Sequence, residues 1–191
     1  MVGGGSVAER RIQGLLGQGA DIRVITAAAT DVIAELAKSK QVALYLKRYE
    51  EADLEGAFMV IAATNDARVN SAVTRMATDR DLLVCCTDDP TRGNYITPAV
   101  IYRGDLMIAI ATGGENATLS SVLKERLEAE FGPEWKLWPR LFGQLRPIIQ
   151  ALPTKSIRSE AVRRVLENKD IETLLKSSRL EDAVAAARKC I

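Results

Sequence analysis

The segment GGGSVA at residues 3–8 restricts the fold of this chain more than any other feature of its sequence. Gly3, Gly5 and Ala8 match the pattern G-x-G-x-x-A, and apolar residues at 8, 12, 15 and 16 predict an amphipathic helix directly behind the turn. In such a turn the first glycine permits a tight bend, the second lets the backbone approach a phosphate, and the small third residue lets helix and strand pack closely. The segment therefore predicts a dinucleotide-binding turn, and an ordinary strand-to-helix turn is the alternative.

Strand and helix patterns alternate after this turn. Residues 20–27, 58–64 and 82–87 are apolar or β-branched runs typical of strands, whereas 31–39 and 65–81 have helical periodicity. This alternation predicts an α/β fold with an open, Rossmann-type parallel sheet and helices on both of its faces. We expect residues 1–89 to form this dinucleotide-binding domain.

The glycine turn stands almost at the first residue, although a turn of this kind needs a strand before it. Met1 and Val2 supply at most a short piece of that strand. We expect that Met1 is internal to a longer natural chain, so that the first strand is truncated. A shortened, weakly paired strand is the alternative.

The pattern changes after Pro90. Residues 94–112 resemble two strands joined by a turn at 103–105, which predicts a β-hairpin. From 118 onward the chain is predicted to be helical, with an apolar stripe at 119, 122, 123, 127 and 131 and later helices at 134–150, 156–168 and 170–189. Pro139 and Pro147 are expected to break or kink the helix at 134–150. The expected domains after 1–89 are a dimerisation β region at 90–114 and a helical C-terminal domain at 115–191.

Composition limits the chemistry. The chain has 191 residues, no histidine and a formal net charge of +1, so acid–base work must fall to Asp, Glu, Lys, Tyr or Cys. Three cysteines form no spaced metal-ligand set; we interpret Cys85 and Cys86 as core strand residues, and Trp135 and Trp138 as helix-packing anchors. No apolar run approaches the roughly 20 residues of a membrane span. We expect no stable metal, nucleic-acid or membrane partner, and a cytoplasmic location.

The side chains do not decide between NAD and NADP. A dinucleotide fold commonly places an acidic residue on the adenosine ribose at the end of the second strand. Here residues 26–29 read TAAA, and Asp31 comes too late to be a confident substitute.

Five segments carry a more specific resemblance: VGGGSVAERR, DLEGAFMVIAATND, VCCTDDP, YITPAVIYRGDLMIAIATGG and LKERLEAEFG. In this order the chain, over roughly residues 2–150, resembles the precorrin-2 dehydrogenase/sirohydrochlorin ferrochelatase family, whose module also forms the N-terminal half of bifunctional siroheme synthases. The resemblance implies a homodimer with interlocked subunits that uses NAD to oxidise precorrin-2 to sirohydrochlorin. In some members ferrous ion is a further substrate. A bifunctional enzyme and a non-catalytic NAD- or tetrapyrrole-binding protein are the alternatives.

The resemblance assigns the key aspartate of the family to Asp88 in CTDDP. Hydride loss from a saturated tetrapyrrole carbon must be accompanied by proton loss, and a partly desolvated carboxylate can accept that proton. The same carboxylate is the group that transient metal chelation would use. Asp89 is its rival, and a turn-capping role for both is the alternative. The family's cofactor contacts fall on Ser6, Val7, Ala27, Ala28, Thr64 and Asn65, in addition to Gly3 and Gly5.

The resemblance also suggests a substrate loop. The family's serine before paired glycines corresponds to Thr112, which with Gly113 leads into a helix that could hold a substrate carboxylate. Asn116 and Ala117 stand where the family usually has Ser-Pro, so the shape of this loop is expected to differ. Because precorrin-2 carries many carboxylates, Arg103 and Arg92 are substrate-binding candidates, with surface or dimer-interface roles as the alternative.

Overall fold

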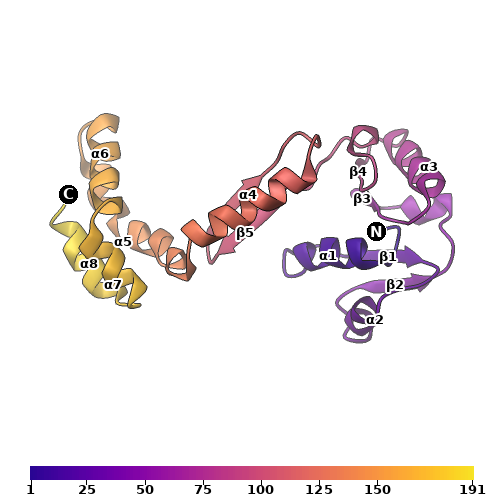
Figure 1. Cartoon of the computed structure of the whole chain (residues 1–191), viewed down its shortest axis with the longest axis horizontal. Coiled ribbons are helices and arrows are strands. Elements are labelled where there is room, and N and C mark those ends of the chain that lie inside the picture. Colours follow the sequence, from indigo (N-terminus) through magenta and orange to yellow (C-terminus); the bar gives the residue numbers. More distant parts are fainter. The chain divides into compact units, whose positions relative to one another are not determined.

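The computed structural model describes residues 1–191 and divides the chain into two compact units, Met1–Thr97 and Pro98–Ile191 (Figure 1). The predicted boundary at 89/90 falls inside the first unit. Each unit is described by itself below. No helix of the chain has both the length and the apolar character needed to cross a membrane.

Unit 1 contains a parallel sheet whose central position is taken by the start of the chain. Its strands are β1 (Arg23–Thr26), β2 (Ala43–Leu46), β3 (Met59–Ala62) and β4 (Leu83–Cys86). β1 pairs with β2 and β3 pairs with β4, both in parallel. Val2 forms parallel bridges to Ile25 on one side and Ala62 on the other, which gives the order β2-β1-Val2-β3-β4. The short first strand is therefore paired on both sides.

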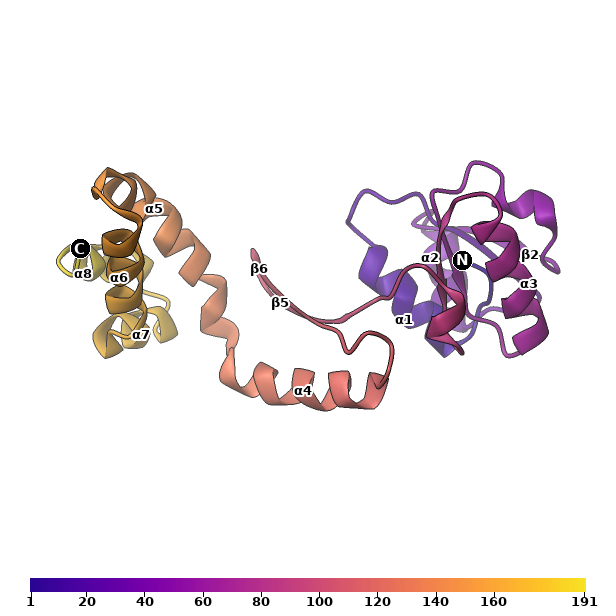
Figure 2. The same ribbon diagram turned by 90° about the horizontal axis from the view of Figure 1, so that it is seen from above.

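Helices cover both faces of this sheet, as the sequence predicts. Ala8 and Ile12 of α1 (Ser6–Leu15) and Ile33 of α2 (Asp31–Lys38) pack in one core cluster with Val24 and Ile61. The other face is covered by α3 (Ala67–Thr78) and the short 3₁₀ helix η1 (Glu51–Leu54), whose core residues are Val73, Ala77 and Leu54 (Figure 2). The chain order reverses at Val2, so the carboxyl edge of the sheet has its topological switch point there.

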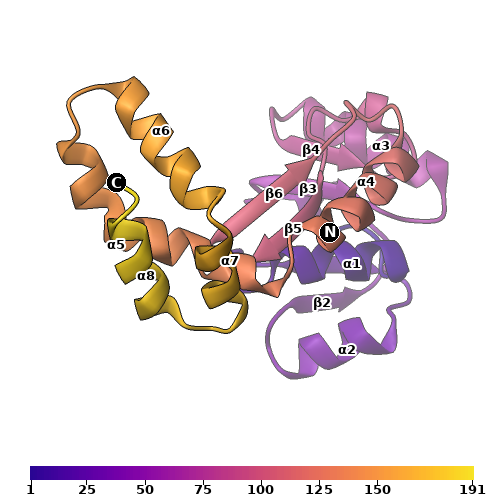
Figure 3. The same cartoon turned by 60° about the vertical axis from the view of Figure 1, so that its left-hand side comes forward.

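Unit 2 begins with the predicted hairpin. β5 (Ala99–Arg103) and β6 (Leu106–Ile110) are antiparallel, and Gly104 takes a φ of 60° in the turn between them. Ile101 is 1% exposed beneath α4 (Ala117–Glu130), which packs along β5 (Figure 1). The remaining helices are η3 (Pro133–Lys136), α5 (Trp138–Ala151), α6 (Lys155–Leu166), α7 (Lys169–Lys176) and α8 (Leu180–Arg188). Figure 3 shows α5 to α8.

These last helices share one core, to which α4 contributes no buried residue. Trp138 is buried in it, and its ring centroid lies 5.6 Å from that of Trp135 and 6.0 Å from that of Phe142. The interpretation of both tryptophans as packing anchors is confirmed. The compact helical core thus begins near Trp135, whereas α4 packs with the hairpin.

Four sequence predictions need correction. The single helix predicted at 170–189 is wrong, because the chain turns at Ser178, with a φ of 58°, and forms two helices, α7 and α8. Pro147 does not break its helix, because α5 continues to Ala151, while Pro139 lies in the first turn, where its missing N–H is harmless. The predicted apolar stripe of α4 is largely uncovered within the chain, with Leu119 and Val122 about half exposed. Strand β2 was not predicted; it is an edge strand with exposed side chains at Tyr45 and Leu46.

Candidate functional site

The glycine turn is held between the ends of β1 and β3. The Gly3 N–H donates to the Ile25 carbonyl at 2.9 Å, and Gly3 adopts a φ of 117°. A Cβ at this position would overlap the Ala63 carbonyl. Only glycine fits here, so the tight bend expected of the first motif glycine is present.

The following residues form an open cradle at the start of α1. A Cβ on Gly5 would meet no atom within 4 Å, and Gly5, Ser6 and Val7 are exposed. The N–H groups of Ser6, Val7 and Ala8 have no backbone acceptor, and Gly5 supplies no side-chain cap. A helix N-terminus with free N–H groups and an accessible backbone fits the pyrophosphate of a dinucleotide. Ala8 is fully buried against the sheet, as the motif requires.

The loop after β1 lies against this cradle. The Thr30 N–H donates to the Gly4 carbonyl at 2.9 Å, and the Thr30 hydroxyl donates to Glu9 Oε2 at 2.7 Å. Ala27 and Ala28, predicted to contact the cofactor, are exposed in this loop. Because this loop has no acidic side chain at Ala27 or Ala28, an adenosine ribose would meet mainly backbone groups there.

A buried asparagine organises the end of β3. Asn70 of α3 is fully buried, and its Oδ1 accepts from the Thr64 N–H at 3.0 Å and from the Thr64 hydroxyl at 2.7 Å. Its Nδ2 donates to the Thr64 carbonyl at 3.0 Å. Thr64 is thereby held at the carboxyl edge of the sheet, and Asn65 beside it is exposed. The sequence analysis missed Asn70, although a polar residue on the apolar face of α3 was a usable signal.

Asp88 follows β4 at the same edge and is exposed. The thiol of Cys86, which is 1% exposed, donates to Asp88 Oδ1 at 2.9 Å. Desolvation raises the pKa of Asp88, but hydrogen bonds from Cys86 and Asn70 and the charge of Arg92 together outweigh it and leave the pKa below its usual value of 3.8. Asp88 is therefore ionised at neutral pH. Desolvation is the largest single influence on this pKa, but the hydrogen bonds and the Arg92 charge together exceed it.

Cys86 has a role beyond the core position that the sequence predicted. Burial, followed by the hydrogen bond to Asp88, raises the pKa of the Cys86 thiol, so at neutral pH it keeps the proton that it donates. Cys85, 5% exposed, packs with the α1 and α2 face. The interpretation of both cysteines as core residues is confirmed, and Cys86 in addition orients Asp88.

Asp89 differs from Asp88 in its contacts. Its Oδ1 accepts from the Thr91 N–H at 3.1 Å and from the Thr91 hydroxyl at 2.6 Å, and its Oδ2 pairs with Arg92 Nε at 2.9 Å. Asp89 thus caps the 3₁₀ helix η2 (Pro90–Arg92). The capping alternative describes Asp89, and the catalytic role of Asp88 stays a prediction.

The predicted substrate loop lies in unit 2. Thr112 Oγ1 donates to the Asn116 carbonyl at 3.0 Å and accepts from the Asn116 N–H at 3.2 Å, while Asn116 Oδ1 caps α4 through the Leu119 N–H at 2.8 Å. Gly113 has a φ of 66° in this tight loop. Thr112, Gly113 and Asn116 are thus brought together, and their contact with substrate stays a prediction.

Arg103 connects the hairpin to the C-terminal end of α4 in unit 2. Its Nε donates to the Phe131 carbonyl at 2.7 Å, and Nη2 donates to the Glu128 carbonyl at 3.4 Å. The guanidinium thereby satisfies carbonyls at the C-terminal end of α4. The structure gives its predicted role in substrate binding no support.

A family model described as "Putative NAD(P)-binding" matches residues 1–99, which contain the glycine turn and Asp88. The chain belongs to this family. The match confirms the predicted class of cofactor, NAD(P), and agrees with the open cradle at Gly5.

Relatives extend the similarity beyond the first unit. The chain is 38% identical to a siroheme synthase of Methylococcus capsulatus over 96% of its own length and 39% of that relative. It is 30% identical to siroheme synthase 1 of Pectobacterium atrosepticum over 98% of its length and 44% of that relative. The chain thus spans about two fifths of these curated relatives. Their names confirm the family resemblance inferred from the sequence.

A solved structure supports the same fold. The structure titled "SirC, precorrin-2 dehydrogenase" aligns with a TM-score of 0.72 and 28% sequence identity, covering 98% of this chain and 92% of that one. The predicted fold class, an α/β Rossmann-type domain followed by a hairpin and helices, is therefore confirmed.

Because the Cys86 thiol donates to Asp88, we expect a substitution of Cys86 to shift the pKa of Asp88. Replacing Cys86 with Ala removes the donor, so the pKa of Asp88 should rise toward or above 3.8, whereas Cys86→Ser keeps an O–H donor and should largely preserve the lower value. A ¹³C NMR titration of the Asp88 carboxyl measures the shift directly. Equal pKa values in all three proteins would contradict the role given to the thiol.

Proposed function

We propose that this protein is a precorrin-2 dehydrogenase that uses NAD to form sirohydrochlorin. The observation that carries the proposal is Asp88, an ionised carboxylate on the same sheet edge as the open glycine cradle. Similarity to SirC precorrin-2 dehydrogenase over 98% of the chain supports the choice of substrate. Cytoplasmic location is part of the same proposal.

Residues of the glycine turn and of the loops after β1 and β3 would bind the cofactor. NAD, when bound, would supply the acceptor for a hydride from a saturated carbon of the tetrapyrrole. The free N–H groups of Ser6 and Val7 would hold its pyrophosphate, and the backbone of Ala27 and Ala28 its adenosine ribose. Thr64, fixed by Asn70, and Asn65 would lie toward the nicotinamide.

Asp88 would take the proton that completes the oxidation. Hydride loss leaves the tetrapyrrole positively charged, so the proton it then releases is acidic enough for a carboxylate with a lowered pKa. The hydrogen bond from the Cys86 thiol to Oδ1 would keep the carboxylate oriented while it receives this proton. The products are sirohydrochlorin, NADH and one proton, which Asp88 passes on to solvent from its exposed position.

An anaerobic assay tests this function. Purified protein is incubated with enzymatically made precorrin-2, with and without NAD, and sirohydrochlorin and NADH are followed by absorbance. Both products should appear together and only with NAD. NAD and tetrapyrrole binding without turnover would replace the proposal with a binding protein. Ferrous ion added afterwards shows whether metal insertion exceeds the spontaneous rate.

We further propose that the protein is a homodimer formed through unit 2. A two-stranded hairpin is marginal alone and has two free edges, and here Tyr102 and Met107, partners across the strands, are 53% and 59% exposed. Leu119 and Val122 add apolar surface on α4. Burial of these side chains in a second copy would explain why the apolar stripe of α4 is uncovered in one chain.

Replacing Met107 with Glu should weaken this dimer by at least about tenfold in Kd, because an unpaired charge would be buried beside Tyr102. Light scattering after size-exclusion chromatography measures the mass across a concentration series, and circular dichroism checks that the variant folds. Gln150→Glu, an exposed change on α5, serves as the control. A monomeric wild type at micromolar concentration, or a folded Met107→Glu dimer of unchanged affinity, would rule out this interface.

A further inference from the structure

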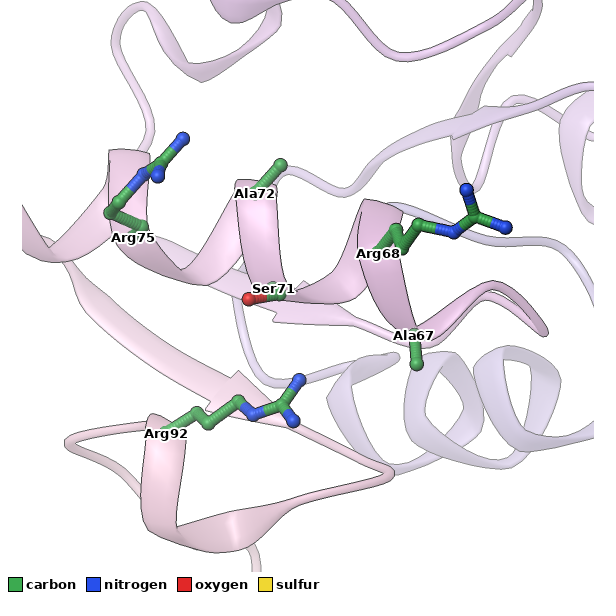
Figure 4. A pocket seen from close by; sticks show the side chains of 6 residues that line it. All are labelled: Ala67, Arg68, Ser71, Ala72, Arg75 and Arg92. Carbon is green, nitrogen blue, oxygen red and sulfur yellow. The ribbon is translucent and has the colours of Figure 1, made fainter.

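An arginine-lined pocket lies on α3, next to η2 (Figure 4). It has a volume of about 380 Å³, within the range of small-ligand sites. Its lining residues are Ala67, Arg68, Ser71, Ala72, Arg75 and Arg92. The pocket belongs wholly to unit 1, as does Asp88.

The sequence of α3 creates the hollow. Residues 68, 71, 72 and 75 recur at helical spacing and share one face of the helix. Ser71 and Ala72 are small lining residues between Arg68 and Arg75, and the two arginines extend from the helix on either side of Ala72 (Figure 4). Two arginines seven positions apart stand about 10 Å apart along the axis. Arg92 approaches from η2.

The charge of this pocket is largely uncompensated. The guanidinium groups of Arg68 and Arg75 have no hydrogen bond or ion pair within the chain, and both residues are exposed. Arg92 pairs with Asp89 through Nε at 2.9 Å, and no other acidic side chain lines the pocket. Guanidinium groups bind carboxylates in bidentate fashion, and several of them suit a ligand that carries several carboxylates.

The pocket also adjoins the proposed proton acceptor. Arg92 stands four positions after Asp88, and its charge helps to lower the pKa of that carboxyl. The cofactor phosphate, by contrast, is expected at the N-terminus of α1, which packs on the opposite face of the sheet from α3. The arginines are thus placed to serve the substrate rather than the cofactor.

We propose that Arg68, Arg75 and Arg92 form a carboxylate-binding pocket that grips one edge of the tetrapyrrole and positions it beside Asp88. This inference rests on the proposed function, because it takes the substrate to be a polycarboxylate tetrapyrrole. The pocket is too small for the whole macrocycle, so it receives acetate or propionate side chains while the ring extends past it.

Kinetics of the double variant Arg68→Gln/Arg75→Gln test the pocket. The KM for precorrin-2 should rise by about tenfold or more for each arginine removed, with kcat and the KM for NAD nearly unchanged. Arg48→Gln, an exposed arginine after the edge strand β2, is the matched control and should behave as the wild type. A rise in the KM for NAD alone would assign the pocket to cofactor phosphates, and unchanged constants would show that it binds neither; both results overturn the proposal.

A binding measurement separates this inference from the proposed reaction. Uroporphyrin carries an acetate and a propionate on every pyrrole, whereas coproporphyrin has methyl groups in place of the acetates. Wild-type protein should bind uroporphyrin more tightly, and the double variant should lose about tenfold or more of that affinity, as followed by porphyrin fluorescence. If the wild type shows this pattern but no turnover, the pocket stands and the dehydrogenase fails. If turnover occurs and the double variant binds uroporphyrin normally, the pocket alone is wrong.

Discussion

Substituting Asp88 with Asn is expected to lower kcat for NAD-dependent oxidation of precorrin-2 by about 100-fold or more, the usual contribution of a positioned acid–base group. Asn has nearly the shape of Asp, and its side-chain oxygen can still accept from the Cys86 thiol at the position of Oδ1. What is lost is the ability to receive a proton. KM for NAD should therefore stay within about twofold, because Asp88 is not assigned to cofactor binding.

Asp89→Asn is the matched control, since it changes the neighbouring residue in the same way. Asp89 caps η2 through Thr91, and Asn is about as good a cap as Asp. We expect kcat to stay within about threefold of the wild type. Steady-state kinetics under anaerobic conditions, with thermal unfolding to verify folding, decide the matter. If Asp89→Asn were as slow as Asp88→Asn, the choice between the two carboxylates would be wrong.

The strongly patterned elements could be predicted from the sequence. β3 and β4 are continuous apolar runs because they are buried, and α3 shows its apolar face through Val73 and Ala77. β2 could not be predicted because it is an edge strand with mostly exposed side chains, so its sequence shows no alternation of apolar and polar residues. The apolar stripe on α4 could be predicted, but periodicity cannot show which surface covers an apolar face, and Leu119 and Val122 are about half exposed.

The backbone of the site was predictable, but its side-chain partners were not. Gly3, Gly5 and Ala8 follow from a local pattern whose spacing is fixed by the turn. That pattern treats Gly4 as variable, yet a Cβ there would overlap the Ala28 carbonyl, which no local rule reveals. Cys86 lies only two residues before Asp88, but no sequence pattern shows that its thiol donates to that carboxylate. Asn70 acts on Asp88 through a contact that depends on how α3 packs against β4. Such contacts between separate elements require the folded arrangement.

A substitution in the glycine turn, Gly3→Ala, is expected to have a large effect on the stability of unit 1. Gly3→Ala should lower the free energy of unfolding of unit 1 by about 3 kcal/mol or more, because a φ of 117° strains an alanine and its Cβ would overlap the Ala63 carbonyl. Relief would require moving the backbone that pairs Gly3 with Ile25. Thermal unfolding should show a midpoint lower by about 12 °C or more for a unit of this size.

Gly5→Ala separates the role in binding from the role in folding. Gly5 has a φ of −85°, which alanine adopts readily, and a Cβ there meets no protein atom, so the loss of stability should be about 1 kcal/mol at most. The same Cβ would enter the cradle where the pyrophosphate is expected, so affinity for NAD should fall by at least about tenfold, or about 1.4 kcal/mol. Isothermal titration of NAD into the folded variant measures this directly. Undiminished affinity would mean that the dinucleotide does not approach the backbone at Gly5, and the cradle would then have to be placed elsewhere on the carboxyl edge of the sheet.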